Sequence, residues 1–228
     1  MFFVHCFKII LLLLINTSFA MKKLSLLISL ILLSFSAIGQ VIEITPSYGF
    51  QFGAKLGYGP NYLKMEDSSQ FGINLGMETY TGLMAEVTYV NMSSALRIRD
   101  VVFSPSESKL ADLNLDWFLI GATRYFKQGK LKPFAGASLG FVVVSPSNEN
   151  NTIIDNNLDS KTRFAFSFKT GVNILLTDII GLNLQGNLYF PVNWAGVYVG
   201  PTGAGISTGS TVILGGFSAG LVFRIDKD

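Results

Sequence analysis

The sequence predicts an all-β protein: a closed, eight-stranded, antiparallel up-and-down transmembrane β-barrel that follows a cleaved N-terminal signal peptide. Residues 40–228 alternate apolar and polar side chains, the period-2 pattern of a strand with two different faces. The alternating segments are long, and the links between them are short and long in turn. The chain is 49% hydrophobic and only 14% charged, whereas a soluble domain carries about 25% charged residues.

The N-terminal region predicts export. From Met21 the chain has a positively charged start, an apolar stretch, and then Ala37 and Gly39 as a small-x-small cleavage site. We therefore expect residues 1–39 to be a signal peptide region, with Met21 as the true start, and residues 40–228 to form the barrel domain. A retained membrane anchor is the alternative, but neither apolar stretch before residue 40 reaches the roughly 20 residues of a spanning helix.

Eight segments are predicted strands. The central pair, residues 113–125 and 131–144, has arms of roughly 11 to 14 residues joined by a short turn, while ordinary strands have about 5 or 6. At about 3.3 Å per residue and a tilt of about 40°, such arms span an outer-membrane apolar band. The other six predicted strands are residues 47–56, 70–78, 83–90, 163–176, 182–190 and 216–225.

The connections alternate in length, which indicates which end of the barrel faces outward. Short turns at one end and long loops at the other are typical of bacterial outer-membrane barrels, with the long loops outside and the termini in the periplasm. A closed ring is expected because lipid offers no hydrogen-bond partner to an open strand edge. A soluble β-sandwich is the alternative. The short turns are residues 79–82, 127–130 and 177–180, and the long links are residues 57–69, 93–112, 145–161 and 192–210.

The residues that most enzymes and metal sites need are scarce. The single Cys is Cys6 and the single His is His5, both inside the predicted signal peptide region. After cleavage the chain would have no thiolate, no His metal ligand and no His general base. We therefore predict no catalytic, cofactor-binding or metal residues, although a glycolipid-modifying enzyme that acts without His stays open. A net charge of +2 predicts no nucleic-acid partner.

Charged residues on the predicted inner faces form a second pattern. The interior of an eight-stranded barrel is just wide enough for its own side chains, so buried charges there must pair. We expect a plug of salt bridges, with a narrow polar conduit as the alternative. The predicted interior charges are Lys55, Glu78, Glu86, Asp116, Arg124, Arg163, Lys169 and Arg224.

Two groups of residues are expected to contact the membrane surface. Arg97, Arg99, Lys109 and Lys161 fall near the predicted outer rim, where they would bind phosphates of outer-leaflet glycolipid or remain simply solvated. Aromatic residues with a polar edge are expected to form girdles at headgroup depth. The candidates are Tyr48, Tyr80, Tyr89, Trp117, Tyr125, Tyr189 and Trp194.

Three stretches, residues 119–126, 131–141 and 166–185, resemble the outer-membrane β-barrel domain family, related in architecture to the small eight-stranded barrels of the outer membrane protein A, X and W kind. The resemblance covers residues 45–225. It implies an outer-membrane location, membrane lipids and lipopolysaccharide as neighbours, assembly by the barrel-assembly machinery and periplasmic chaperones, and no catalytic residues. The family's last strand usually ends on an apolar assembly signal, which Phe223 and Ile225 match.

These patterns indicate the cellular location of the protein more clearly than its molecular function. We expect a monomeric, non-enzymatic outer-membrane protein with a structural, adhesive or surface-binding role carried by its four long extracellular loops. The alternatives are a small-solute channel of the porin kind and an accessory subunit of a secretion or envelope-assembly machine.

Overall fold

The computed structural model describes residues 41–101, 104–127, 129–150, 158–192, 196–200, 203–207 and 212–226. The predicted signal peptide region and Trp194 lie outside these residues, so the expected export signal and domain boundary remain predictions. In the part of the chain that is described, no helix is long and apolar enough to cross a membrane.

Twelve strands make up the described structure. They are β1 (Val41–Gln51), β2 (Ala54–Tyr58), β3 (Asn61–Met65), β4 (Ser68–Tyr80), β5 (Leu83–Asp100), β6 (Ser104–Tyr125), β7 (Leu131–Ser147), β8 (Lys161–Leu175), β9 (Ile180–Pro191), β10 (Gly196–Gly200), β11 (Gly203–Ser207) and β12 (Leu214–Asp226).

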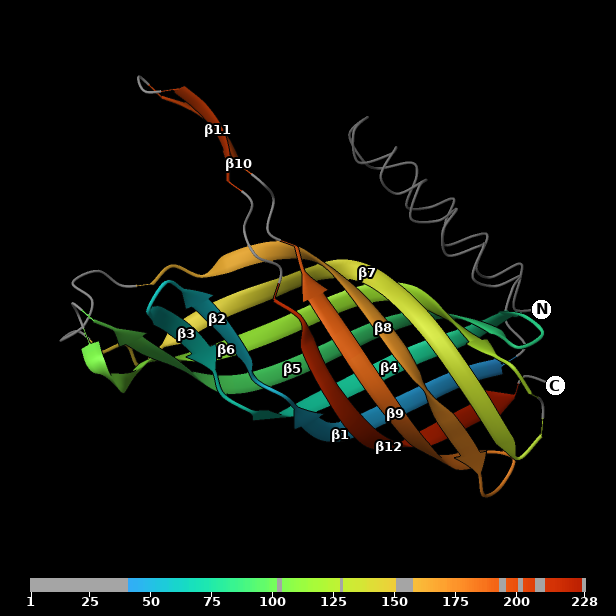
Figure 1. Cartoon of the computed structure of the whole chain (residues 1–228). Helices are drawn as coiled ribbons and strands as arrows, with labels where there is room; N and C mark the ends of the chain where they lie inside the picture. Colours follow the sequence, from blue (N-terminus) through green and yellow to red (C-terminus); the bar gives the residue numbers. More distant parts are fainter. Residues whose placement is uncertain are drawn as a thin grey trace, which may run out of the picture. The chain divides into compact units, whose positions relative to one another are not determined.

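Eight of these strands close into a ring. The order is β1-β4-β5-β6-β7-β8-β9-β12, every pair is antiparallel, and β12 returns to pair with β1 (Figure 1). The closing pair runs from Val41 opposite Asp226 to Gln51 opposite Gly216. The predicted closed, eight-stranded, up-and-down barrel is therefore confirmed.

The alternation of side chains sets the two faces of this ring. On β9, Leu184 points outward with 49% of its surface exposed, whereas its neighbour Asn183 points inward and is 4% exposed. The same contrast recurs on β12 between outward Phe217 and inward Ser218. A soluble protein rarely leaves so many large apolar side chains uncovered, so this outward belt fits a lipid environment.

Short turns close one end of the barrel. At the β4–β5 turn Gly82 adopts a positive φ of 75°, which glycine reaches without a steric cost, and its N–H donates to Glu78 Oε1 at 2.8 Å. At the β8–β9 turn the Thr177 hydroxyl accepts from the backbone of Ile180. In outer-membrane barrels such short turns lie in the periplasm, so the opposite end is extracellular.

The first predicted strand is corrected by the structure. We expected one strand from residue 47 to 56, but β1 ends at Gln51, and a hairpin of β2 and β3 follows. The break occurs at Gly53, whose N–H donates to the side chain of Asp67 at 2.7 Å. Strand β3 then pairs with the outer part of β5, so the hairpin lies outside the ring of eight strands.

The predicted long loop at residues 93–112 is also corrected. Strand β5 continues to Asp100 and β6 begins at Ser104, so most of that stretch is a paired, two-stranded arm. The polarity pattern of β5 inverts near Ser93, and the pairing of β5 with β6 shifts register further along, between Leu96 and Arg97. The strand itself continues in phase: outward Val87 belongs to the apolar belt, and outward Arg97 and inward Leu96 belong to the part above it.

Ring closure predicts a heat-dependent electrophoretic shift. The full chain, refolded in detergent and kept unheated, should migrate differently from the boiled sample on a denaturing gel, because every strand edge of the ring is paired within the protein. As a control, a chain truncated after residue 213 lacks β12 and should show a single position, heated or not. Identical positions for the two forms of the full chain would contradict a closed ring.

Candidate functional site

The outer half of the barrel interior is filled by apolar side chains. Trp117 on β6 is fully buried, and its ring lies 4.9 Å from that of Tyr189 on β9, across the barrel. Ala54 and Met65 of the β2–β3 hairpin pack against this cluster from the extracellular side. We call it the apolar plug; its buried members are Val90, Met92, Leu115, Trp117, Leu119, Val142, Ala165, Tyr189 and Leu214.

The periplasmic half of the interior is polar. Glu43 of β1 accepts a hydrogen bond of 2.5 Å from the Tyr125 hydroxyl, which itself accepts from Asn173 Nδ2 at 2.7 Å. Asn183 Nδ2 then donates to Asn173 Oδ1 at 2.6 Å. This chain of hydrogen bonds joins strands β1, β6, β8 and β9, so it ties opposite walls of the barrel together.

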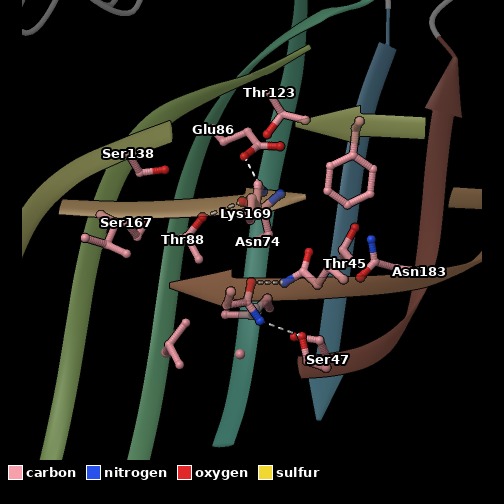
Figure 2. Close-up of a pocket in the computed structure, with 18 of the residues that line it drawn as sticks. Thr45, Ser47, Asn74, Glu86, Thr88, Thr123, Ser138, Ser167, Lys169 and Asn183 are labelled. Atoms are coloured by element: carbon pink, nitrogen blue, oxygen red, sulfur yellow. Dashed lines mark hydrogen bonds and ion pairs between the residues drawn. The ribbon is translucent and has the colours of Figure 1, made fainter. Parts of the chain in front are cut away.

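An ion pair lies above this chain, in the centre of the barrel. Lys169 Nζ of β8 donates to Glu86 Oε2 of β5 at 2.5 Å, and the two side chains are 13% and 4% exposed (Figure 2). Gly136 leaves room for the pair, because a Cβ at that position would lie 3.1 Å from Lys169 Cε and 2.3 Å from Thr123 Oγ1. A desolvated pair of this kind is strongly coupled.

A small cavity surrounds the ion pair. Its volume is about 40 Å³, and Glu86, Lys169, Thr123, Asn183 and Gln70 are among its lining residues (Figure 2). Buried side-chain oxygens of the last three have no protein hydrogen-bond partner. At about 10 to 15 Å³ per water, the space fits about three water molecules and is far too small for a continuous water-filled passage.

The structure brings two of the predicted interior charges, Glu86 and Lys169, into contact. Glu78 caps the β4–β5 turn. Arg163 of β8 and Arg224 of β12 are each half-buried and have interaction partners. These residues lie at different heights along the barrel, so the described charges do not form one continuous salt-bridge plug.

Three predicted interior charges lie elsewhere. Lys55 is exposed on β2, because β1 ends before it. Asp116 and Arg124 are on the outward phase of β6, since the interior there is apolar and takes Trp117 instead. Asp116 accepts hydrogen bonds from the Tyr89 hydroxyl at 2.7 Å and from Asn91 at 2.8 Å, on the outer face of the barrel.

Two charges buried inside the ring of eight strands were not predicted, and a third, Asp100, is buried at the outer end of β5. Glu43 lies before the first predicted strand, although its alternation with Ile42 and Ile44 already continued that strand's pattern. Lys132 is 4% exposed, and its Nζ lies 5.3 Å from the centre of the Tyr125 ring. The Pro that follows it obscured the alternation of β7.

The structure divides the predicted girdle residues between the outer face and the interior of the barrel. Tyr48 and Tyr80 point outward, whereas Trp117, Tyr125 and Tyr189 fill the interior. For Trp117 and Tyr125 the reason is again the phase of β6. On the extracellular side a row of rings crosses four strands at directly paired positions. It consists of Tyr89, Phe118, Phe141 and Phe164, with ring centres 5.2 and 5.3 Å apart for the first two contacts.

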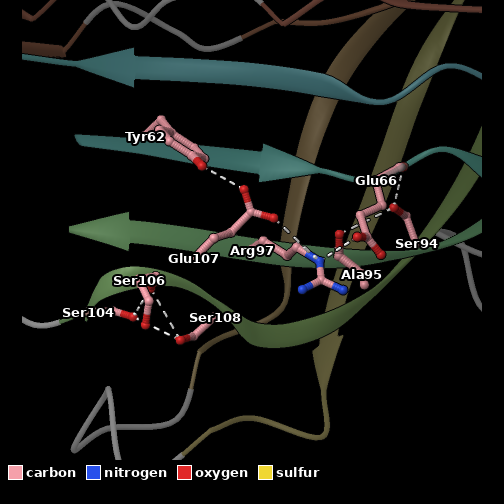
Figure 3. Close-up of polar contacts among 9 residues, drawn as sticks. All are labelled: Tyr62, Glu66, Ser94, Ala95, Arg97, Ser104, Ser106, Glu107 and Ser108. Atoms are coloured by element: carbon pink, nitrogen blue, oxygen red, sulfur yellow. Dashed lines mark hydrogen bonds and ion pairs between the residues drawn. The ribbon is translucent and has the colours of Figure 1, made fainter. Parts of the chain in front are cut away.

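Above this aromatic row a four-stranded sheet extends beyond the belt. It contains β2, β3, the outer end of β5 and residues 104–111 of β6, and we call it the outer sheet. One face is apolar and includes Leu63, Leu96 and Ala111. The other face is polar and carries three of the four predicted rim cations. Figure 3 shows one of them, Arg97, with Glu66 and Glu107.

Cations occupy one row of the polar face. Lys55 is paired with Lys64, Lys64 with Arg97, and Arg97 with Lys109, so one cation from each strand lies next to the one on the neighbouring strand. We call this set the cation row. Arg99 lies two residues further along β5, opposite Tyr62.

Three carboxylates lie among these cations. Arg97 forms a salt bridge with Glu66 and lies 3.8 Å from Glu107, and Lys109 Nζ lies 2.7 Å from Asp112. The hydrogen bond from Lys109 lowers the pKa of Asp112 below 3.8. The polar face therefore carries five cations, and two of them, Arg97 and Lys109, form salt bridges with neighbouring carboxylates.

Tyr62 and Glu107 form a further contact on this face. The Tyr62 hydroxyl donates to Glu107 Oε2 at 2.6 Å, which lowers the pKa of Glu107 below 4.5 and raises the pKa of Tyr62 above 10.0. Lys55 Nζ lies 3.7 Å from the centre of the Tyr62 ring. Tyr62 therefore joins a cation and a carboxylate from strands β2 and β6.

Of the four predicted rim cations, the structure brings Arg97, Arg99 and Lys109 together on the outer sheet. Lys161 is exposed on β8, paired with Val144 of β7, and is not part of the sheet. Within the described residues no group of three or more His, Cys, Asp or Glu is arranged to hold a metal ion.

Removing one partner of the central ion pair should destabilise the barrel. We expect Lys169→Met to lower the free energy of unfolding by about 3 kcal/mol, because Glu86 would remain charged and buried. The double variant Glu86→Leu/Lys169→Met should recover most of that loss. Urea unfolding of the protein refolded in lipid vesicles measures both, with Lys130→Met at an exposed turn as the control; equal losses in the single and double variants would contradict the coupling.

The Tyr62–Glu107 bond should be visible in a titration. Above pH 4.5 the carboxylate accepts the bond, and the bond's contribution to the outer sheet is lost as the pH falls through the lowered pKa. We expect Tyr62→Phe to raise the pKa of Glu107 toward 4.5. Carbon-detected NMR of the Glu carboxyl groups measures this change, and Tyr80→Phe at the opposite end should leave it unaltered.

No family model and no curated protein matches the sequence, but solved structures do. The outer membrane protein OprG from Pseudomonas aeruginosa superposes with a TM-score of 0.60 at 9% identity, covering 83% of this chain and 97% of OprG. Neisserial surface protein A gives 0.55 at 16% identity, covering 83% and 99%.

A weaker similarity is to the outer membrane protease OmpT from Escherichia coli, with a TM-score of 0.42 at 8% identity, covering 82% of this chain and 97% of OmpT; it carries no argument about activity. The identities to OprG and Neisserial surface protein A are also low enough that they establish architecture alone. The closed ring, the outward apolar belt and these two superpositions agree: the chain has the fold of the small eight-stranded outer-membrane β-barrels, and its belt fits that membrane.

Proposed function

We propose that this protein is a non-enzymatic surface-binding protein, in which the closed barrel is an anchor and the outer sheet with its neighbouring loops is the binding surface. The observation that carries the proposal is the apolar plug. Trp117 and its neighbours fill the outer half of the interior. Extracellular molecules would therefore contact the outer sheet and the loops, and not the inside of the barrel.

The shape of the outer sheet supports this role. An unstructured loop would lose conformational entropy on binding, whereas the paired strands of the outer sheet are already ordered. Its apolar face continues into the plug through Ala54 and Met65, which fixes the sheet to the barrel. The polar face of the sheet is left for a ligand.

The alternative of a small-solute channel has less support. The interior cavity of about 40 Å³ lies on the periplasmic side of the plug, and a conducting path would require the plug to move. The proposal that the protein is not an enzyme rests on the sequence, since its only His and Cys are His5 and Cys6.

Conductance separates an anchor from a channel. The full chain, reconstituted in a planar lipid bilayer, should give no reproducible current steps, because the plug blocks the interior. The variant Trp117→Ala, which removes the largest plug side chain, should show more frequent openings, provided that its heat-dependent gel shift confirms folding. Regular steps from the unaltered protein would favour the channel.

Removing the β2–β3 hairpin tests the binding surface. A variant with residues 54–65 replaced by a short Gly-Ser linker keeps all eight ring strands, so it should retain the heat-dependent gel shift. Cells that display it should adhere less to a panel of immobilised glycans and host-cell surfaces than cells with the full chain. A Gly-Ser insertion at the 127–130 turn is the matched control. Unchanged adhesion of the hairpin variant would contradict the proposal.

A further inference from the structure

The cation row is unusual because its members lie directly opposite one another on neighbouring strands. Like charges at directly opposed positions of neighbouring strands repel one another, and here the repulsion recurs at three successive pairs, from Lys55 through Lys64 and Arg97 to Lys109. Neighbouring carboxylates offset this only in part, because the salt bridges found among the described residues involve Arg97 and Lys109 and not Lys55 or Lys64. An anion placed along the row would relieve the remaining repulsion.

The row is linear and held in place. Neighbouring strands are about 4.8 Å apart, so the four cations extend over about 14 Å. That length exceeds one phosphate or sulfate group and suits a chain with several of them. The backbone of each cation is paired in the sheet, and the opposite face is apolar and rests partly on the plug. The positive groups are therefore arranged before a ligand arrives.

The row lies well above the membrane. Arg97 is eight residues beyond Tyr89 of the aromatic row on the same strand; at about 3.3 Å per residue and a tilt of about 40°, this is about 20 Å along the membrane normal. Lipid headgroups next to the aromatic row are too low to reach it. A ligand that extends outward from the membrane, or comes from outside, is needed.

We propose that the cation row binds a sugar chain that carries several sulfate or phosphate groups. The chain lies across β2, β3, β5 and β6, with its anionic groups on Lys55, Lys64, Arg97 and Lys109. This inference rests on the proposed surface-binding function and names the ligand class of that surface. Two sources share this chemistry: an external sulfated polysaccharide, and the phosphorylated saccharide core of a neighbouring glycolipid.

Binding of dextran sulfate tests the proposal. The full chain, refolded in phosphatidylcholine vesicles, should bind dextran sulfate in isothermal titration, and the affinity should fall steeply with added NaCl. The double variant Lys55→Gln/Lys64→Gln should bind about tenfold more weakly, since it removes half of the row. Among the described residues the salt bridges of this face involve Arg97 and Lys109, so the variant leaves them in place. Uncharged dextran should not bind.

The control variant is Lys127→Gln/Lys130→Gln, which loses the same charge at the periplasmic turn and should bind as the full chain does. Equal losses in both double variants, or no effect of Lys55→Gln/Lys64→Gln, would overturn the proposal. If dextran sulfate fails to bind while hairpin removal still abolishes adhesion, the ligand class is wrong and the surface-binding function stands.

The source is decided in a second set of vesicles that contain a phosphorylated core glycolipid. If the glycolipid supplies the natural ligand, it occupies the row and the added dextran sulfate binds about tenfold more weakly than in phosphatidylcholine. If the ligand is external, the two affinities agree.

Discussion

Closure of the backbone hydrogen bonds is the constraint on which the rest of the structure depends. In lipid an unpaired N–H or C=O costs several kcal/mol, so β12 must return to β1. It pairs with β1 from Val41 to Ile44 and from Ser47 to Gln51. Once the ring has eight strands, its interior is narrow, and side chains must fill it. The outward side chains must be apolar over the same height. The membrane location, the apolar plug and the outward apolar belt all follow from the closed ring.

Two kinds of side chains fill the barrel interior. Toward the outside it is packed by apolar groups around Trp117, and toward the periplasm by hydrogen-bonded polar groups around Tyr125 and the Glu86–Lys169 pair. Where the interior is apolar, the inward and outward residues of a strand are both apolar, so the sequence does not show which face is which. This is why the phase of β6 was wrong in the sequence prediction, and why Asp116 was placed inside.

The sequence was sufficient for the eight strands and their order, because long alternating segments and short turns depend on local residues. In β9 the local pattern agrees with the structure, because buried Asn183 and Asn187 alternate with outward leucines. The outer sheet and its cation row were not predicted, although Arg97, Arg99 and Lys109 were noted. They depend on pairing between β3 and β5, which are separated by β4 in the sequence, and no local pattern reveals such pairing.

The continuation of β5 and β6 beyond the apolar belt has a mechanical consequence. Between Phe118 and Asn114 the outward surface changes from apolar to hydrogen-bonded polar groups, including Asp116, within one rigid strand pair. A thicker bilayer would place those polar groups in lipid, and a thinner bilayer would expose the phenylalanines to water. Either change would cost free energy. The strand pair therefore favours one bilayer thickness. Its length also sets the distance between the outer sheet and the lipid surface.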